Sequence, residues 1–306
     1  MVHTELVLRL NDRQYTNWLK AGRCLLILKE ALHPFIDARM RTFHRDLLCG
    51  NPFLRKPCHS LTCRPRRNKL SGACALCAEW QAEILRHHRQ PEVTINWDNC
   101  YPPSWRGDHW EVAKAYMPRG QAKVKRADQC DAAALLNLIN HCWCFQSVDT
   151  YCVREVISYR NQLMHSCELR VEDEWLQNFQ TTLAHFTRLF RELPQMAAAG
   201  RQIHQMLSVD LSISVSGSDQ LVTDALDGPE TSADLISQWE AELLREKLQE
   251  LFAVASEEES PQSLDRKEVS SLSGFLQANK DLSQRFSEEL QVIALQAGTE
   301  EARTAD

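Results

Sequence analysis

The sequence predicts an all-α protein, and two observations lead to this class. Apolar residues recur at helical spacing over long stretches, and no segment before about residue 205 alternates apolar and polar residues between turn signals. A chain of 306 residues with 43% hydrophobic and 25% charged residues is also long enough to bury a core. A helical bundle is therefore the simplest architecture.

The first two expected helices lie on either side of a proline. Residues 11–32 carry an apolar side and begin with an asparagine, a favourable N-cap residue. Pro34 should end this helix because proline lacks the N–H that a helix interior needs, and a second helix should then run to Gly50. Residues 51–76 lose the helical periodicity and predict a loop, and residues 78–88 resume a short helix.

Four further helices are expected before residue 200. A short one surrounds residues 110–116 and is followed by a basic loop at 123–126. Longer helices are expected over residues 128–145, 149–166 and 172–193. The aspartate that begins the second of these longer helices can cap it.

The chain is expected to divide into a helical domain at residues 1–200, with a Cys-rich loop at 49–77, and a C-terminal part. Residues 206–233 are rich in Ser, Asp and Gly and predict a linker, although four apolar residues there alternate as in a strand. Residues 234–298 hold two amphipathic stretches and predict a helical hairpin, and residues 299–306 predict a disordered tail. The hairpin must bury its apolar stripe against the first domain or a partner.

The net charge of −6 combines a basic part and an acidic part. Residues 1–205 carry 28 Lys and Arg against 20 Asp and Glu, a net +8, and residues 206–306 carry 7 against 21, a net −14. This split is typical of a polyanion-binding domain with an acidic tail, and equally of a tail that only aids solubility.

All 12 cysteines lie between Cys24 and Cys167. The first residues lack a basic region followed by an apolar run, so no secretory signal is expected, and the apolar run at residues 24–28 is too short to span a bilayer. The expected location is the cytosol or the nucleus, where thiols stay reduced and serve in metal sites or cores rather than in disulfides.

Four cysteines of the loop have the spacing of a metal site. Cys58 and Cys63 are followed, after ten intervening residues, by the CxxC pair Cys74 and Cys77. Four thiolates are a usual ligand set for tetrahedral structural zinc, and a loop with few apolar residues would depend on the metal for its fold. We therefore expect one zinc ion at these four cysteines, and the alternative is a reduced loop without metal. Rival ligands are His59, Cys49 and Cys100.

The same loop carries a group of cations that could hold RNA phosphates. Nuclear import and a plain solvated surface are equally compatible with them. These cations are Arg64, Arg66, Arg67 and Lys69. The cysteines outside the loop fall in helical patterns and are expected to be small core residues. They are Cys24, Cys130, Cys142, Cys144, Cys152 and Cys167.

A short segment near the end of one helix combines groups suited to RNA cleavage without a metal. Arg160 can hold a phosphate, Asn161 can orient it, and His165 can transfer protons near neutral pH. The apolar side of this helix is complete without Arg160 and His165, so both are expected to be exposed, and Arg160→Ala should preserve the fold. Arg39 and His44 show the same spacing by chance. The alternative for the later pair is a helix-end cation and a histidine favoured by the helix dipole.

Two groups of residues resemble the HEPN domain type found in a vertebrate RNA-binding ubiquitin ligase. They are WEVAKAYMPRG at residues 110–120 and the motif Arg160-Asn161-x3-His165, and the similarity covers about residues 5–195. Nearly the whole chain also resembles an uncharacterised vertebrate family encoded by an open reading frame on the human X chromosome. The residues that carry this second likeness include 17–22, 77–80, 83–88 and 244–250.

The HEPN resemblance implies a helical bundle that pairs with a second copy across the helix bearing Arg160 and His165. In active HEPN ribonucleases this pairing gathers two Arg–His sets into one metal-independent RNA-cleaving site, whereas many other HEPN domains are RNA-binding or assembly modules. It implies that His165 acts as general acid or base, that Arg160 stabilises phosphate charge, and that Asn161 orients them. The Cys-rich loop departs from the minimal HEPN core.

Two functions follow as hypotheses. The first is an RNA-linked HEPN module, in its strongest form a homodimeric endoribonuclease that cleaves single-stranded RNA without a metal. The second is a non-enzymatic dimerising adaptor that binds protein partners through the C-terminal helices. Under both, structural zinc is expected, no cofactor is needed for catalysis, and neither membrane association nor DNA specificity is expected.

Overall fold

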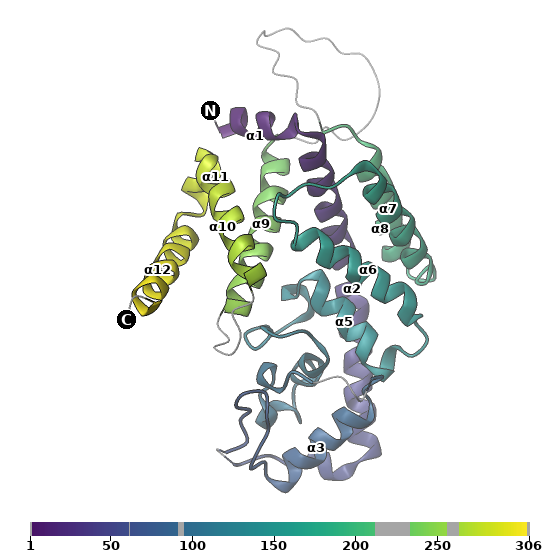
Figure 1. Ribbon diagram of the computed structural model, residues 1–306. Helices are drawn as coiled ribbons and strands as arrows, with labels where there is room; N and C mark the ends of the chain where they lie inside the picture. Colours follow the sequence, from purple (N-terminus) through teal and green to yellow (C-terminus); the bar gives the residue numbers. More distant parts are fainter. Residues whose placement is uncertain (1, 61, 91–94, 212–232, 256–262, 305–306) are drawn as a thin grey trace. The chain divides into compact units, whose positions relative to one another are not determined.

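The computed structural model is built of helices (Figure 1). It describes residues 2–60, 62–90, 95–211, 233–255 and 263–304. Over these ranges two isolated backbone bridges occur and no strand forms, so the predicted all-α class is confirmed. No helix within them is both long enough and apolar enough to cross a membrane. The α-helices are α1 (Val2–Leu10), α2 (Arg13–Gly50), α3 (Ala75–Arg86), α4 (His109–Ala113), α5 (Ala132–His141), α6 (Thr150–Met164), α7 (Asp173–Arg188), α8 (Pro194–Ser208), α9 (Ala233–Ala255), α10 (Ser263–Ala278), α11 (Lys280–Arg285) and α12 (Ser287–Thr304).

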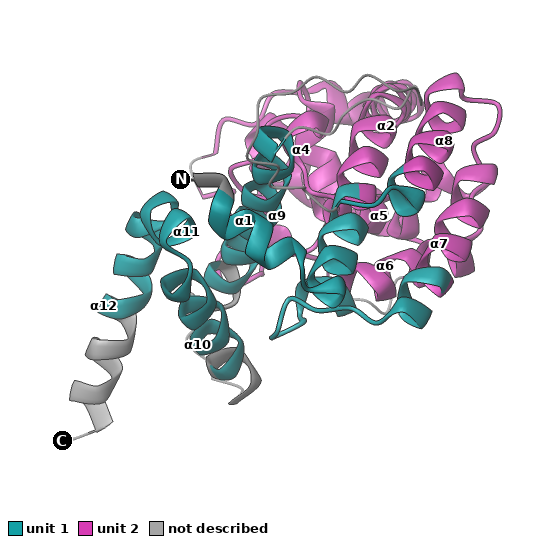
Figure 2. Cartoon of the chain, turned by 90° about the horizontal axis from the view of Figure 1, so that it is seen from above, with its two compact units in different colours: residues 1–23, 162–177, 206–306 teal, residues 24–161, 178–205 magenta. Residues whose placement is uncertain are grey.

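The chain folds into two compact units, which Figure 2 shows in two colours. Helices α2, α6, α7 and α8 each begin in one unit and end in the other. The units differ from the predicted division, which placed a boundary after residue 200, because the N-terminal residues pack with the C-terminal helices. Unit 1 contains residues 1–23, 162–177 and 206–306, and unit 2 contains residues 24–161 and 178–205.

The core of unit 1 buries the apolar stripe of α9. Trp239, Leu244 and Leu248 of this helix are buried, and α9 contacts α1. The first turns of α2 approach α9 closely at Gly22, where an added Cβ would lie 2.3 Å from a Leu243 methyl group. The stripe of α9 therefore meets α1 and the first turns of α2, which belong to the predicted first domain, and this is the first of the two expected alternatives.

The C-terminal helices are more broken than the sequence predicts. Instead of one long second helix, α10 ends before Asn279, and α11 ends before Phe286. Asn279 takes an extended conformation and accepts a hydrogen bond from Arg9 at 3.1 Å, so a contact from the other end of the chain accompanies the break. The predicted tail continues α12 to Thr304. Most of the predicted linker, including half of its strand-like pattern, lies outside the described residues.

The N-terminal prediction was wrong at Pro34, because α2 runs through it. Pro34 is exposed, so the carbonyl that loses its donor can bond to water. Leu32 and Ile36 on either side are fully buried, and their packing outweighs the local cost of proline. Asp12 caps α2 by accepting from Gln14 and Tyr15 N–H groups, in place of the expected asparagine. Helices α1 and α8 were not predicted.

In unit 2 a buried ion pair holds the irregular segment between α3 and α5. Lys114 Nζ donates to Glu111 Oε1 at 2.8 Å and to the Ala122 carbonyl, and both charged side chains are buried. The second oxygen of Glu111 accepts from the Tyr101 N–H. Asn99 adds hydrogen bonds to the Lys114 and Pro118 carbonyls. The segment at residues 110–120 is thus tied into the core of unit 2 by buried polar contacts.

Candidate functional site

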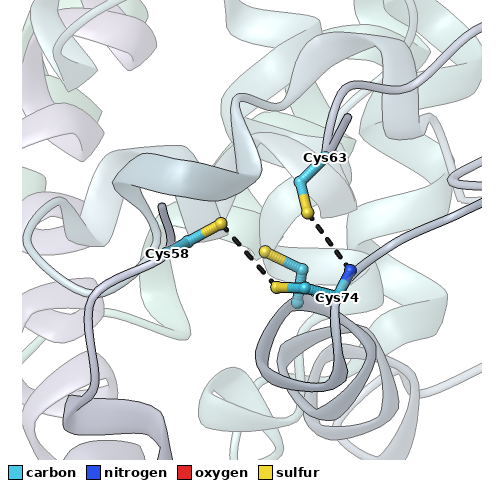
Figure 3. A group of neighbouring side chains, drawn as sticks. Cys58, Cys63 and Cys74 are labelled. Atoms are coloured by element: carbon cyan, nitrogen blue, oxygen red, sulfur yellow. Dashed lines mark hydrogen bonds between the residues drawn. The ribbon is translucent and has the colours of Figure 1, made fainter. Parts of the chain in front are cut away.

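The four cysteines predicted to bind zinc come together where the Cys-rich loop meets the start of α3. Cys74 is the N-cap residue of α3, and Cys77 lies in its first turn. Cys58 and Cys63 approach them from the preceding loop (Figure 3). The CxxC spacing places two thiols at a helix N-terminus, where the helix dipole favours negatively charged sulfur.

The geometry of this cysteine cluster suits one metal ion. All four sulfur atoms lie within 4.8 Å of one another, and Cys58 Sγ lies 3.8 Å from Cys74 Sγ. In a tetrahedral zinc site with Zn–S bonds of about 2.3 Å, sulfur atoms are about 3.8 Å apart. The four thiols are therefore close enough to hold a metal ion. The rivals His59, Cys49 and Cys100 are not members of this group within the part of the chain that the structure describes.

The protonation of the cluster also bears on metal binding. Burial opposes ionisation of Cys63, but a hydrogen bond from the Cys74 N–H at 3.2 Å and neighbouring side chains lower its pKa to about 7. Burial and the adjacent thiols raise the pKa of Cys77. Four thiolates this close repel one another, so full ionisation needs a cation among them. A divalent metal that displaces the protons supplies that charge.

Along the chain, the four cations of the loop lie between Cys63 and Cys74. We call the turn that carries Arg64, Arg66, Arg67 and Lys69 the basic turn. All four are exposed, and none forms an ion pair with a residue that the structure describes. Arg67 and Asn68 have φ of 49° and 56°, and mutual backbone hydrogen bonds between Arg66 and Lys69 close the turn.

Hydrogen bonds to a later segment of the chain hold the basic turn in place, and an aromatic ring lies beside it. The N–H of Asn68 donates to Asp98 at 2.6 Å, and its side chain donates to the Ile95 carbonyl at 2.8 Å. The guanidinium of Arg64 lies 5.5 Å from the ring centre of Tyr101, which is 42% exposed. The turn therefore presents its cations beside an exposed aromatic side chain from another segment of the chain.

The expected exposure of Arg160 was wrong. Its side chain is 5% exposed and donates to Asp131 Oδ2 at 2.9 Å, and Asp131 also caps α5 by accepting from the Ala134 N–H. Arg160 follows Val153 and Val156 at helical spacing, so it lies on the buried stripe of α6. The sequence pattern showed this stripe, but not that an aspartate elsewhere would pair with an arginine on it.

Replacing Arg160 with methionine should lower the free energy of unfolding by about 1.5–3 kcal/mol, because a hydrogen bond to a charged, half-buried partner is removed. The burial of Arg160 thus reverses the expectation that Arg160→Ala preserves the fold. Arg201→Met on α8 is the control, since Arg201 is exposed. Urea unfolding of both variants measures the difference, and equal, small losses would contradict the structural role of Arg160.

His165 lies just beyond the end of α6, in unit 1, and its side chain is 49% exposed as expected. Its Nδ1 lies 3.2 Å from Glu268 and its Nε2 lies 3.7 Å from Glu250. The hydrogen bond with Glu268 raises the pKa of His165 although burial opposes the rise. Glu268 is also paired with the buried Lys247. The imidazole is therefore surrounded by carboxylates, and Asn161 is exposed.

Arg39 and His44, which have the same spacing as Arg160 and His165, form separate structural contacts. His44 is buried, lies 2.6 Å from the Trp105 carbonyl and stacks on Trp80. Arg39 donates to the Cys144 carbonyl at 2.9 Å. A pocket of about 500 Å³ in unit 2, lined in part by Arg39, His87 and Trp143, was not predicted, because its lining comes from distant parts of the chain.

Comparison with known proteins gives one family and one relative. A family model described as a domain of unknown function, DUF4559, matches residues 9–298. A mouse (Mus musculus) protein described as "Uncharacterized protein CXorf38 homolog" is 41% identical over 297 residues, which cover 96% of this chain and 92% of the mouse protein. The likeness to a vertebrate family encoded on the X chromosome is thereby confirmed. No solved structure matches the chain.

Proposed function

This chain belongs to the DUF4559 family, and we propose that it is a zinc-stabilised, RNA-linked module of HEPN type that binds single-stranded RNA through the basic turn. The observation that carries the proposal is the basic turn itself. Its cations are exposed, and it lies between cysteines that are close enough to share a metal ion. The HEPN resemblance, in which many members bind RNA, supports the same substrate class.

The chemistry of the basic turn suits an unpaired strand. Exposed arginines neutralise backbone phosphates, and an exposed aromatic ring lets an unstacked base pack on its face. Arg64 and Tyr101 lie close enough to serve one nucleotide in both ways. Zinc bound by the cysteine cluster would keep the turn in place, because few apolar side chains hold this loop.

Binding is favoured over cleavage. For catalysis Arg160 would have to reach a phosphate, yet its guanidinium is buried against Asp131. His165 is accessible, but Glu268 and Glu250 surround it with negative charge that repels a phosphate. The alternative, a homodimeric ribonuclease, requires α6 to rearrange so that Arg160 is released from Asp131. The experiment below tests this alternative as well.

The test is RNA binding by full-length protein that retains its metal. Arg64→Ala/Arg66→Ala should weaken binding of a labelled single-stranded RNA, measured by fluorescence anisotropy. The slope of log K against log salt should become shallower by about 0.7 for each phosphate that the variant no longer neutralises. Arg188→Ala/Arg201→Ala removes the same charge from exposed positions on α7 and α8 and should leave both quantities nearly unchanged.

Two outcomes would overturn the binding proposal. Equal losses in both double variants would mean that binding depends on net charge and not on the basic turn. Absence of RNA binding would favour the second function, an adaptor, for which the exposed Val292 and Leu295 on α12 are the supporting observation. Cleavage of the RNA without added metal ions, abolished by His165→Ala, would restore the ribonuclease alternative.

A further inference from the structure

Three sulfur atoms that do not belong to the cysteine cluster lie close together in unit 2. They belong to Met40, Cys142 and Cys144, and we call these residues the sulfur cluster. Cys144 Sγ lies 3.3 Å from Cys142 Sγ and 3.7 Å from Met40 Sδ. Met40 and Cys142 are fully buried, and both cysteines are free thiols. The sequence predicted these two cysteines only as small core residues.

Two separate elements hold the sulfur atoms in place. Met40 lies on the buried side of α2. Cys142 is the C-cap residue of α5, where its N–H donates to the Leu138 carbonyl, and a short 3-10 turn (Trp143–Phe145) follows it. The N–H of Trp143 donates to the His87 carbonyl at 2.9 Å, which ties this turn to the end of α3. The cluster thus lies between a long helix and a hydrogen-bonded turn.

We propose that the sulfur cluster binds one Cu(I) ion through the thiolates of Cys142 and Cys144 and the thioether of Met40. Thiolate and thioether sulfur are soft ligands that select Cu(I), whereas zinc is bound by cysteine thiolates, histidine nitrogens and carboxylate oxygens. The Cys144–Met40 distance of 3.7 Å is close to the spacing of about 3.8 Å between sulfur ligands of a tetrahedral zinc ion, and the Cys142–Cys144 distance of 3.3 Å is shorter, so these two thiols move apart slightly when a metal ion binds. Binding releases two thiol protons to solvent and transfers no electron.

The surroundings supply both charge balance and an entry path. Two thiolates and one Cu(I) ion leave one negative charge, and Arg39 lies beside it, since its Nε donates to the Cys144 carbonyl at 2.9 Å. Burial and the Cys142 thiol raise the pKa of Cys144, while Arg39 acts in the opposite direction. Cys144 lines the pocket of about 500 Å³ together with Arg39 and Trp143, so the pocket gives a route from solvent to this residue.

The test is an anaerobic titration of the zinc-loaded, full-length protein with Cu(I) in competition with a bathocuproine chelator. Wild type should retain one Cu(I) per chain without releasing zinc, and X-ray absorption should show sulfur ligands only. Cys142→Ser/Cys144→Ser should abolish this binding, and Met40→Leu, which conserves volume, should weaken it by about ten-fold or more. Matched controls are Cys152→Ser and Met196→Leu, a buried cysteine and a buried methionine of the same unit.

Each other result counts against the sulfur cluster. If the double serine variant binds Cu(I) as tightly as wild type and loses zinc, the copper lies at the cysteine cluster instead. If wild type cannot retain Cu(I) against the chelator, the sulfur atoms are only packed against one another. Zinc content and circular dichroism show that each variant is folded before it is compared.

Discussion

Arg9→Met is expected to lower the free energy of unfolding by about 3–5 kcal/mol, because it leaves a buried carboxylate without its cation. Arg9 donates to both oxygens of Glu240 at 2.7 Å, and the Glu240 side chain is 0% exposed. The same guanidinium bonds to Asp281 at 2.7 Å. Methionine conserves much of the apolar stem, so the loss reports on charge. Urea unfolding followed by circular dichroism measures it.

Two further variants separate this buried pair from an ordinary surface pair. Arg13→Met removes the partner of Asp173, but the Arg13 side chain is 79% exposed, so the loss should stay below about 1 kcal/mol. Arg9→Met/Glu240→Gln should recover part of the stability of Arg9→Met, because the unpaired charge is gone. If Arg9→Met and Arg13→Met were equally mild, the network around Glu240 would not stabilise unit 1.

Cys77→Ser is expected to reduce the zinc content from about one ion per chain to none, because a hydroxyl is a poor ligand and three thiolates remain. Structural zinc contributes its binding free energy, about 10–16 kcal/mol in zinc-finger peptides, to the folding of the segment that holds it. Amide hydrogen exchange should therefore lose protection over the loop before α3. Helices α5 and α6 should keep their protection, since none of the four cysteines lies in them.

Elemental analysis of protein purified without chelator measures the zinc, and Cys49→Ser serves as the matched control. Cys49 is an exposed rival ligand near the end of α2, so its replacement should leave the zinc content unchanged. Zinc-free wild type, or zinc retained by Cys77→Ser, would contradict the assignment. Loss of zinc should also weaken RNA binding, because the basic turn lies between the ligands.

Much of the fold was predictable because helical periodicity is a local property. The apolar sets of α6 and α9 are visible in the sequence, and both helices form close to the expected residues. Local signals failed where a distant contact outweighed them. Pro34 does not end α2 because buried neighbours hold the helix, and a helix breaks at Asn279 where Arg9 contacts it. The sequence does not show how deeply Leu32 and Ile36 are buried, nor that Arg9 reaches Asn279.

The candidate sites divide in the same way. The sequence by itself determined the helical class and the grouping of Cys58, Cys63, Cys74 and Cys77, because short spacing and a helix start bring these thiols together. Only the tertiary structure decided that Arg160 is buried against Asp131 and that Met40 joins Cys144, pairs separated by 29 and 104 residues. It also joined Arg9 to Glu240 across 231 residues. The physical reason is that periodicity shows which face is buried, whereas long-range packing selects what that face meets.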